Sequence, residues 1–350
     1  MPGIETIRRN VDTALSRIVG STIRIYKLDR IAPEMCSGIS DFTLRKGKRI
    51  RPLLFSMGYL GYVREPACGF YYSAAAVELF HSFILIHDDV IDKAELRRGR
   101  PALHVVYRDA LRRSGGAKGE DLSIVAGDLV YSMAISSFLK IREESARKEL
   151  ALRKVLETAF YTGSGQFIEL VNDRRPISQI GLDEIYRTYD LKTASYTFAG
   201  PLAAGALLAG AHPRTASRLY RSGLLMGRAF QIRDDILDIF GDELNTGKTI
   251  WKDIEECKKT VLLWHAYHYG NSSVKKYLRR LLEAEQTERP VTHTLKQTLR
   301  EILIGAGSLA FAESEIARQF DRARIGKAMI GMDDGYRKLL GDYSRSLLEN

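Results

Sequence analysis

Residues 80–92 constrain the fold of this chain more than any other stretch, because an apolar run ends there in three acids. The stretch reads FHSFILIHDDVID and holds neither Gly nor Pro, so it favours a buried helix. Asp88 and Asp92 would lie one above the other on that helix, since residues four apart share a face. Their charges repel each other, so the pair needs a cation. Oxygen ligands without Cys or His favour Mg²⁺, whereas Asp89 points to another side and is the weaker ligand.

A second acid cluster repeats this pattern. Residues 230–240 read FQIRDDILDIF, with Asp234, Asp235 and Asp238 at the same spacing inside another apolar run. Buried charges are costly unless they are paired or bind a metal, so solvent-facing helix surfaces explain the two clusters poorly. We expect the clusters to face each other across an apolar hollow, where several Mg²⁺ ions would surround one polyphosphate.

Composition indicates a single all-helical domain over residues 1–350. The chain is 45% hydrophobic and 27% charged, an ordinary globular composition, and few of its segments alternate as strands do. Helical patterns are expected at residues 4–28, 66–92, 123–139, 147–173 and 216–240. The polar, glycine-rich residues 109–121 are expected to form a surface loop.

The sequence also predicts a cytoplasmic protein. It has no run of eighteen apolar residues that would form a transmembrane helix, and the N-terminus MPGIETIRRN is too polar for a signal peptide. Cys36, Cys68 and Cys257 are widely spaced and odd in number, so they fit neither a disulfide framework nor a zinc site. Such cysteines fit a reducing compartment.

The formal net charge of +10 is compatible with nucleic acid, a membrane surface or an anionic small molecule. The Lys and Arg residues are scattered over the chain, and no zinc-finger or RNP-type signature accompanies them, so no nucleic-acid partner is expected. An anionic substrate remains, and it could use part of the positive surplus.

Two basic segments could hold its phosphates. Residues 44–52 read LRKGKRIRP, with five cations around Gly47, which fits either a solvated loop or a phosphate clamp. Arg97 and Arg98 follow the first acid cluster directly. They could merely neutralise the aspartates, but we favour phosphate binding, because acids that hold Mg²⁺ beside arginines suit phosphoryl chemistry.

Two further polar residues lie in apolar surroundings. His81 precedes Asp88 by about two helical turns and so points to nearly the same side. The sequence leaves open whether His81 is a buried core residue or binds a ligand. Lys192 lies in an apolar segment and should meet an anion, because Lys is seldom buried unpaired.

Paired carboxylates, basic clamps and apolar helix walls together suit a diphosphate joined to a hydrocarbon. Ionisation of an allylic diphosphate needs all of them. Metal ions and cations stabilise the departing diphosphate, and a dry apolar cavity shelters the allylic carbocation from water.

These residues resemble the trans-isoprenyl diphosphate synthase family over nearly the whole chain. The matching segments are GKRIRP at 47–52, DDVID, RRGRP, Lys192-Thr193, FQIRDDILD, Lys248 and Lys258. The resemblance implies an all-α bundle around a central cavity, usually a homodimer. It also implies head-to-tail condensation of isopentenyl diphosphate with an allylic diphosphate, whose released diphosphate takes the final proton.

The resemblance further implies roles for single residues. The Mg²⁺ ligands would be Asp88, Asp92 and Asp234, with Asp238 nearby. Isopentenyl diphosphate would be held by Lys48, Arg51, His81 and Arg98. The allylic diphosphate would be held by Arg97, Lys192, Thr193, Gln231, Lys248 and Lys258. The residues acting directly in catalysis would be Asp88, Asp92, Asp234, Lys192 and Arg97.

Product length in this family depends on bulk upstream of the first cluster, here Phe80, Phe83 and Ile84. Phe83 precedes Asp88 by roughly 7.5 Å of helix rise, and an aromatic residue there resembles short-chain archaeal-type geranylgeranyl diphosphate synthases. Geranylgeranyl diphosphate is the expected product, and farnesyl diphosphate is the alternative. The family commonly has Pro and Gly where this chain has Thr249 and Trp251.

Two other activities share this fold. A terpene cyclase would usually carry an Asn/Ser/Glu metal motif in place of the second acid cluster and would lack Lys48 and Arg51. A non-catalytic partner subunit would be expected to have lost acids from one cluster, and none is missing here. Both are weaker alternatives than the synthase.

Overall fold

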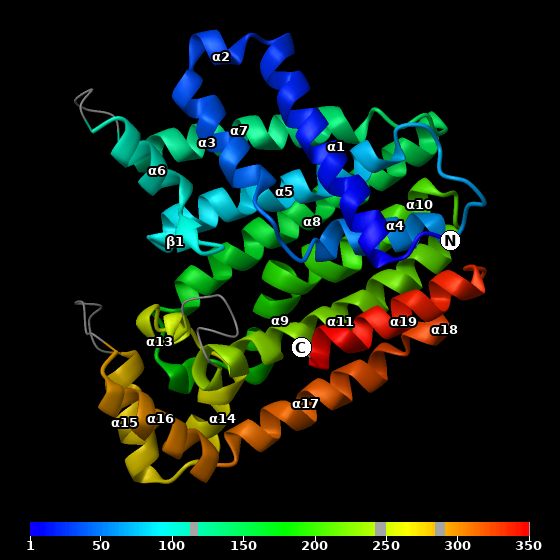
Figure 1. The fold of residues 1–350 in the computed structure, drawn as a ribbon. Coiled ribbons are helices and arrows are strands. Elements are labelled where there is room, and N and C mark those ends of the chain that lie inside the picture. The colour runs from blue at the N-terminus through cyan, green and yellow to red at the C-terminus, as the bar shows by residue number, and fades with distance from the viewer. Residues whose placement is uncertain (113–117, 242–249, 284–290, 350) are drawn as a thin grey trace. The chain divides into compact units, whose positions relative to one another are not determined.

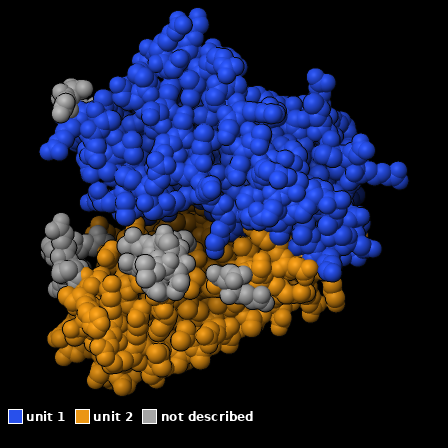
Figure 2. Space-filling model, in the orientation of Figure 1, with its two compact units in different colours: residues 1–155, 201–216, 331–339 blue, residues 156–200, 217–330, 340–350 orange. Residues whose placement is uncertain are grey.

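The computed structural model describes residues 1–112, 118–241, 250–283 and 291–349 of the chain. These residues are mostly helical and contain only one short two-stranded hairpin, which confirms the all-α prediction (Figure 1). They divide into two compact units, coloured separately in Figure 2. Unit 1 comprises residues 1–155, 201–216 and 331–339, and unit 2 comprises residues 156–200, 217–330 and 340–350. One domain over residues 1–350 stays a prediction.

Unit 1 contains the elements of the N-terminal half. They are α1 (Ile4–Ile25), α2 (Leu28–Ile31), α3 (Pro33–Leu44), α4 (Ile50–Leu60), α5 (Phe70–Ile91), β1 (Leu96–Arg97), β2 (Arg100–Pro101), α6 (Leu103–Ala110) and α7 (Gly119–Phe138). Four helices contribute residues to both units: α8 (Ser145–Asn172), α10 (Gly200–Leu208), α11 (Pro213–Phe240) and α19 (Asp334–Glu349).

The core of unit 1 lies around α4 and α5. Ten of the eleven α4 residues are buried, and the first half of α5 is mostly buried as well. A Cβ at Gly58 of α4 would overlap the backbone of Leu202 in α10, and one at Gly205 would overlap that of Phe55. Glycine at these two points therefore lets α4 and α10 pack backbone to backbone.

A short hairpin follows α5 and was not predicted from the sequence. In it Leu96 pairs with Pro101 and Arg97 with Arg100 in an antiparallel ladder. The two turn residues, Arg98 and Gly99, have φ of 55° and 70°. Two positive φ values are what a two-residue hairpin turn requires, because that turn matches the twist of the strands. The hairpin brings Arg97 beside Asp89 near the end of α5 and Arg98 beside Glu78 in its middle.

Unit 2 contains the remaining elements. They are η1 (Ile177–Gln179), α9 (Leu182–Tyr189), the π-helical segment η2 (Asp190–Ala199), α13 (Lys252–Glu255), α14 (Val261–Tyr269), α15 (Ser272–Leu282), α16 (His293–Gly305), α17 (Ser308–Ala323) and α18 (Ile325–Ala328). Three of them begin at a side-chain cap of the expected type. Thr260, Asn271 and Thr292 accept hydrogen bonds from Leu263 N, Val274 N and Leu295 N, respectively.

Trp251 is the largest fully buried side chain of unit 2. Its φ of 76° is unusual for a bulky residue and is the conformation that glycine adopts easily. The indole lies against two cations of α16, with Lys296 Nζ 5.5 Å and Arg300 Cζ 5.2 Å from the ring centroid. Burial and these cation–π contacts offset the cost of the backbone conformation.

The predicted helices agree with the structure apart from their ends. The helix expected at 66–92 begins at Phe70, because Gly69 has a φ of 87° and precedes it as the N-cap. The helix expected at 4–28 ends at Ile25, shortly before Lys27 adopts a φ of 52°. Within the described ranges, no helix is both long and apolar enough to cross a membrane.

Candidate active site

The first acid cluster lies at the C-terminal end of α5 in unit 1. Asp88 and Asp92 are partly exposed, and Asp89 is fully buried. Asp92 caps the helix, and its backbone N–H donates to the carbonyl of Asp88 at 2.8 Å. Asp88 and Asp92 thus follow each other by one turn, as the spacing predicts, while Asp89 faces the protein.

Arg97 of β1 makes an ion pair with the buried Asp89. Its Nε donates to Asp89 Oδ1 at 2.7 Å, its Nη2 also contacts this oxygen, and Nη2 lies 3.8 Å from Asp88 Oδ2. Burial would lower the pKa of the Arg97 guanidinium, but Asp89 and Asp88 raise it on balance. Arg97 therefore neutralises the cluster here, and its phosphate-binding role stays a prediction.

A buried glutamate organises the basic segment of unit 1. Glu78 on α5 is almost completely buried and accepts from Arg49 Nη1 at 2.6 Å and from Arg98 Nη2 at 3.2 Å. Arg49 also contacts Asp12 at 2.8 Å. Such charge-assisted hydrogen bonds fix a guanidinium firmly. The sequence analysis did not identify Glu78 as a site residue. An acid inside an apolar helix could have indicated it, because a buried acid needs a cationic partner.

His81 lies one turn after Glu78 and is buried among arginines. Burial, and the positive charges of Arg51, Arg98 and Arg97, lower the pKa of His81 well below its usual range. The imidazole is therefore neutral at pH 7. Four of the residues predicted to bind substrate thus lie near one another in unit 1.

The GKRIRP segment lies against the same group. A Cβ at Gly47 would come within 3.1 Å of Arg98 Cζ, so glycine allows the backbone to approach this guanidinium. Lys48 is exposed and Arg51 partly buried at the beginning of α4. The segment is therefore not simply a solvated loop, because its arginines are built into unit 1.

The three residues expected to set product length lie on α5. Phe80 is buried, whereas Phe83 and Ile84 are partly exposed. The two phenyl rings flank Tyr131 of α7, with centroid distances of 5.5 Å and 5.0 Å. Their positions are therefore held by aromatic packing, and their role in product length stays a prediction.

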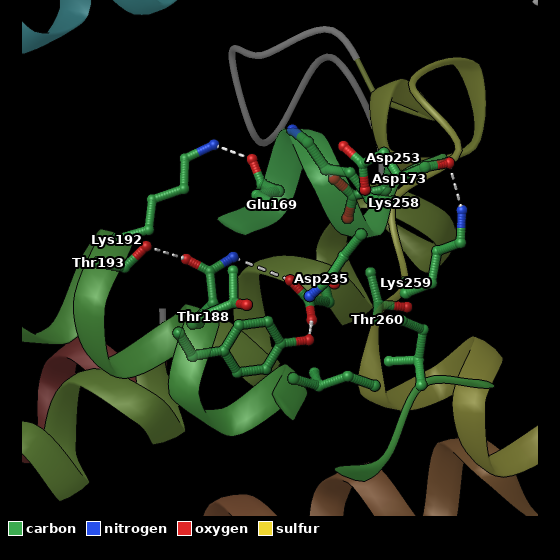
Figure 3. Close-up of a pocket in the computed structure, with 15 residues that line it drawn as sticks. Glu169, Asp173, Thr188, Lys192, Thr193, Asp235, Asp253, Lys258, Lys259 and Thr260 are labelled. Atoms are coloured by element: carbon green, nitrogen blue, oxygen red, sulfur yellow. Dashed lines mark hydrogen bonds and ion pairs between the residues drawn. The ribbon is translucent and has the colours of Figure 1, made fainter. Parts of the chain in front are cut away.

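Unit 2 contains a polar pocket formed by α8, α9, η2, α11, α13 and the segment between α13 and α14 (Figure 3). Its charged lining residues are Glu169, Asp173, Asp235, Asp253, Lys192, Lys258 and Lys259. A Cβ at Gly165 of α8 would overlap the backbone of Lys192, so this glycine brings α8 and η2 together. The pocket holds cations that suit a phosphate beside acids that suit a metal ion.

A chain of buried and partly buried hydrogen bonds connects several of the helical segments at this pocket (Figure 3). Thr193 Oγ1 donates to Gln231 Oε1 at 2.8 Å, and Gln231 Nε2 donates to Asp235 Oδ1 at 2.9 Å. The Tyr189 hydroxyl donates to Asp235 Oδ2 and accepts from Val261 N at 3.1 Å. Burial, and the charge of Asp253, raise the pKa of Asp235 well above its usual range. These hydrogen bonds join η2, α9, α11 and α14.

The three lysines of the pocket have defined partners. Lys192 forms an ion pair with Glu169, which confirms that it meets an anion. Lys258 Nζ lies 2.5 Å from Glu256 Oε2 and 3.8 Å from Asp253 Oδ1. Lys259 Nζ donates to two backbone carbonyls at 2.7 Å. Lys248, also predicted to bind the allylic diphosphate, lies outside the described residues, as does Thr249.

Asp238 of the second cluster caps α13. Its carboxylate accepts from the backbone N–H groups of Lys252 and Asp253, both at 3.2 Å. Burial, and the charge of Asp253, raise the pKa of Asp238 to about 7. Asp234 and Asp238 are both partly exposed and do not line the pocket, whereas Asp235 is buried and lines it. The three acids of this cluster thus have different surroundings.

The carboxylates of both clusters fit Mg²⁺ by their chemistry. Among the described residues, no three His, Cys, Asp or Glu side chains converge as a ready-made metal site. Mg²⁺ needs only one or two carboxylates where phosphate and water supply its other oxygens. Asp88 and Asp234 are exposed enough for such ligands to reach them. Metal binding at either cluster, and the mutual placement of the two clusters, stay predictions.

Comparison with known proteins identifies the family. A family model described as polyprenyl synthetase matches residues 33–300. The chain belongs to the polyprenyl synthetase family. Within this family, it is 34% identical over 300 residues to the geranylfarnesyl diphosphate synthase of Aeropyrum pernix, covering 84% of this chain and 87% of that protein. It is 32% identical to the geranylgeranyl diphosphate synthase of Sulfolobus acidocaldarius over 279 residues, 77% of this chain and 79% of that one.

A solved structure of the polyprenyl synthetase fold resembles this chain throughout. It is the geranylgeranyl pyrophosphate synthase of Corynebacterium glutamicum, complexed with isoprenyl diphosphate and magnesium. The TM-score is 0.87 at 26% identity, and the match covers 99% of both chains. The fold class and the family expected from the motifs are thereby confirmed.

Proposed function

We propose that this polyprenyl synthetase is a Mg²⁺-dependent short-chain trans-prenyltransferase. It joins isopentenyl diphosphate head to tail to an allylic diphosphate. The observation that carries the proposal is the unit 2 pocket, where Lys192, Thr193 and Gln231 meet around buried carboxylates. A pocket with both signs of charge suits a diphosphate that brings its own metal ions.

In unit 1, we assign isopentenyl diphosphate to Lys48, Arg51, His81 and Arg98. Glu78 holds Arg98 in place, and the exposed Lys48 is accessible to a phosphate. His81 is neutral, so it binds by hydrogen bonding rather than by charge. Arginine and lysine differ usefully here, because Arg gives bidentate contacts and Lys a compact charge.

We assign the allylic diphosphate to Lys192, Thr193, Gln231 and Lys258 of unit 2, with Lys248 and, from unit 1, Arg97 as further contacts. The Lys192 and Lys258 ammonium groups are now paired with Glu169 and Glu256. A diphosphate would exchange these partners for phosphate oxygens. The cations then stabilise the negative charge that develops as the allylic C–O bond breaks.

Mg²⁺, held by Asp88, Asp92 and Asp234 with Asp238 nearby, would supply Lewis-acid stabilisation of the departing diphosphate. The double bond of isopentenyl diphosphate attacks the allylic carbon, a new C–C bond forms, and a proton is lost. We assign that proton to the released diphosphate, as the resemblance to the family implies.

We propose geranylgeranyl diphosphate as the main product, with farnesyl diphosphate as the alternative. The named relatives make products of different lengths, so the family alone does not decide. Phe80 and Phe83 support a short product, because two aromatic rings packed on Tyr131 add bulk upstream of Asp88.

We also propose a cytoplasmic homodimer. In unit 2, the α8 side chains Phe160 and Phe167 are 77% and 69% exposed and lie two turns apart on one face. Leu170 and Val171 extend this apolar face. A second copy would cover it, since large exposed apolar patches usually mark interfaces.

The free thiols of Cys36, Cys68 and Cys257 fit a reducing compartment.

The test is a product assay on the purified chain. Labelled isopentenyl diphosphate is supplied with Mg²⁺ and, in turn, dimethylallyl, geranyl or farnesyl diphosphate, and the dephosphorylated products are sized by chromatography. We expect label in geranylgeraniol, loss of all product with EDTA, and recovery with excess Mg²⁺. Absence of labelled product with every primer, or cyclic hydrocarbons formed without isopentenyl diphosphate, would overturn the proposal.

A further inference from the structure

The corner between α1 and α3 carries large apolar side chains that no packing explains. Ile25, Tyr26 and Ile31 are 68%, 64% and 73% exposed. None of the residues of the intervening helix α2 is buried. Figure 1 draws α2 at the outer end of α1, where the chain turns back into α3. Several large exposed hydrophobes so close together indicate a contact surface rather than a requirement of folding.

Cations alternate with these apolar residues. Arg24, Lys27 and Arg30 are all exposed, and no ion pair engages them within the described part of the chain. The only acid between residues 24 and 31 is Asp29, so the corner has a net positive charge. Apolar and aromatic side chains interleaved with Lys and Arg are typical of segments that lie at the surface of a membrane.

We propose that residues 24–31, the α1–α2 corner, dock on the surface of an anionic lipid bilayer. Ile25, Tyr26 and Ile31 enter the interfacial region, where a tyrosine can keep its hydroxyl in water. Arg24, Lys27 and Arg30 remain at the level of the lipid phosphates, to which their charge is complementary. No described helix can span the bilayer, so the contact is peripheral.

A second copy of the chain fits this corner less well. A symmetric contact would place the same surface against itself and so bring cations onto cations. Three apolar side chains also fall far short of the roughly 20–30 residues per side that a stable protein interface uses. The bilayer requires neither a matching shape nor so large an area.

The test measures co-sedimentation of the full chain with large unilamellar vesicles. Vesicles of phosphatidylcholine with phosphatidylglycerol are compared with vesicles of phosphatidylcholine alone, without substrate, so the outcome is independent of prenyl transfer. We expect binding to the anionic vesicles that weakens as salt is added. The variants I25S/Y26S/I31S and R24Q/K27Q/R30Q should each lower the partition coefficient by roughly tenfold or more.

Matched controls separate the corner from general effects. I304S/I330S removes two exposed apolar side chains elsewhere, and R218Q/K276Q/R280Q removes three exposed cations elsewhere. Both should bind vesicles like the parent, and circular dichroism should show that all variants fold. The proposal would be overturned if the parent protein does not bind anionic vesicles, or if the corner variants bind them as tightly as the parent does. It would also be overturned if a corner variant instead changes the oligomer mass in sedimentation equilibrium.

Discussion

The Tyr189 hydroxyl donates to the carboxylate of Asp235, and this single buried contact joins two helical segments that carry the predicted diphosphate ligands. Tyr189 immediately precedes η2 with Lys192 and Thr193, and Asp235 lies beside Asp234 on α11. The same hydroxyl accepts the first backbone N–H of α14, which follows Lys258 and Lys259. Tyr189 is therefore a positioning residue for the unit 2 pocket.

Replacing this tyrosine tests that relationship. Tyr189→Phe leaves a buried Asp235 oxygen and the Val261 N–H without their common partner, so the free energy of unfolding should fall by about 1–3 kcal/mol. The KM for the allylic diphosphate should rise, because Lys192 and Thr193 lose their alignment. Urea denaturation and initial rates measure both effects. Tyr277→Phe, also on the unit 2 core, is the control and should change stability by less than about 0.5 kcal/mol.

Removing an aromatic ring upstream of Asp88 should lengthen the product. Phe83→Ala removes a partly exposed ring that packs on Tyr131, so a longer hydrocarbon chain can extend past this point. Chromatography of the dephosphorylated products should show at least one additional isoprene unit. Ile304→Ala removes an exposed side chain of α16 and is the control that should leave the product unchanged. If Phe83→Ala makes an unaltered product, the growth of the product's hydrocarbon chain is limited by other residues.

The buried Glu78 should control affinity for isopentenyl diphosphate. Glu78→Gln keeps the side-chain shape but weakens its hold on Arg49 and Arg98. We expect the KM for isopentenyl diphosphate to rise by about tenfold, the equivalent of one charge-assisted hydrogen bond. The KM for the allylic diphosphate should change less. Glu95→Gln removes the exposed partner of Arg108 and serves as the control that should have no effect.

The pocket carboxylates should make metal-free stability depend on pH. Burial, and then the charge of Glu169, raise the pKa of Asp173 from 3.8 to about 7. The folded state therefore binds this proton more tightly than the unfolded state, so the stabilisation is complete below about pH 4 and is lost as the pH rises towards 7. Chemical denaturation in EDTA should follow this direction. Asp173→Asn should make the free energy of unfolding depend less steeply on pH. If the dependence is as steep in this variant as in the parent, Asp173 is not its cause.

The helical framework could be predicted from the sequence because its signals are local. The apolar runs that end in Asp92 and Asp238 have helical spacing and contain no breakers, and both segments are helical as expected. The short hairpin could not be predicted, since it depends on Arg98 adopting a φ of 55°, which a side chain other than glycine rarely does.

The partners within the site were harder to predict than its ligands. Arg49 and Glu78 are 29 residues apart, and Tyr189 and Asp235 are 46 apart. Nothing in either local pattern reveals such a pairing, because it arises only when helices pack. The capping of α13 by Asp238 was missed for the same reason, whereas Lys192 could be assigned an anion from its apolar surroundings alone.

The most direct test of the account is a double-mutant cycle on kcat with Asp88→Asn and Asp234→Asn. If both acids act on the diphosphate of one substrate, each variant alone should lower kcat by roughly a hundredfold or more. The double variant should then be only a few-fold worse than the poorer single variant, because residues that act as a unit are not additive. Asp183→Asn, an exposed acid, is the control. The account would be contradicted if the fold-decrease in kcat of the double variant equals the product of the two single decreases. It would also be contradicted if either single variant keeps the kcat of the parent.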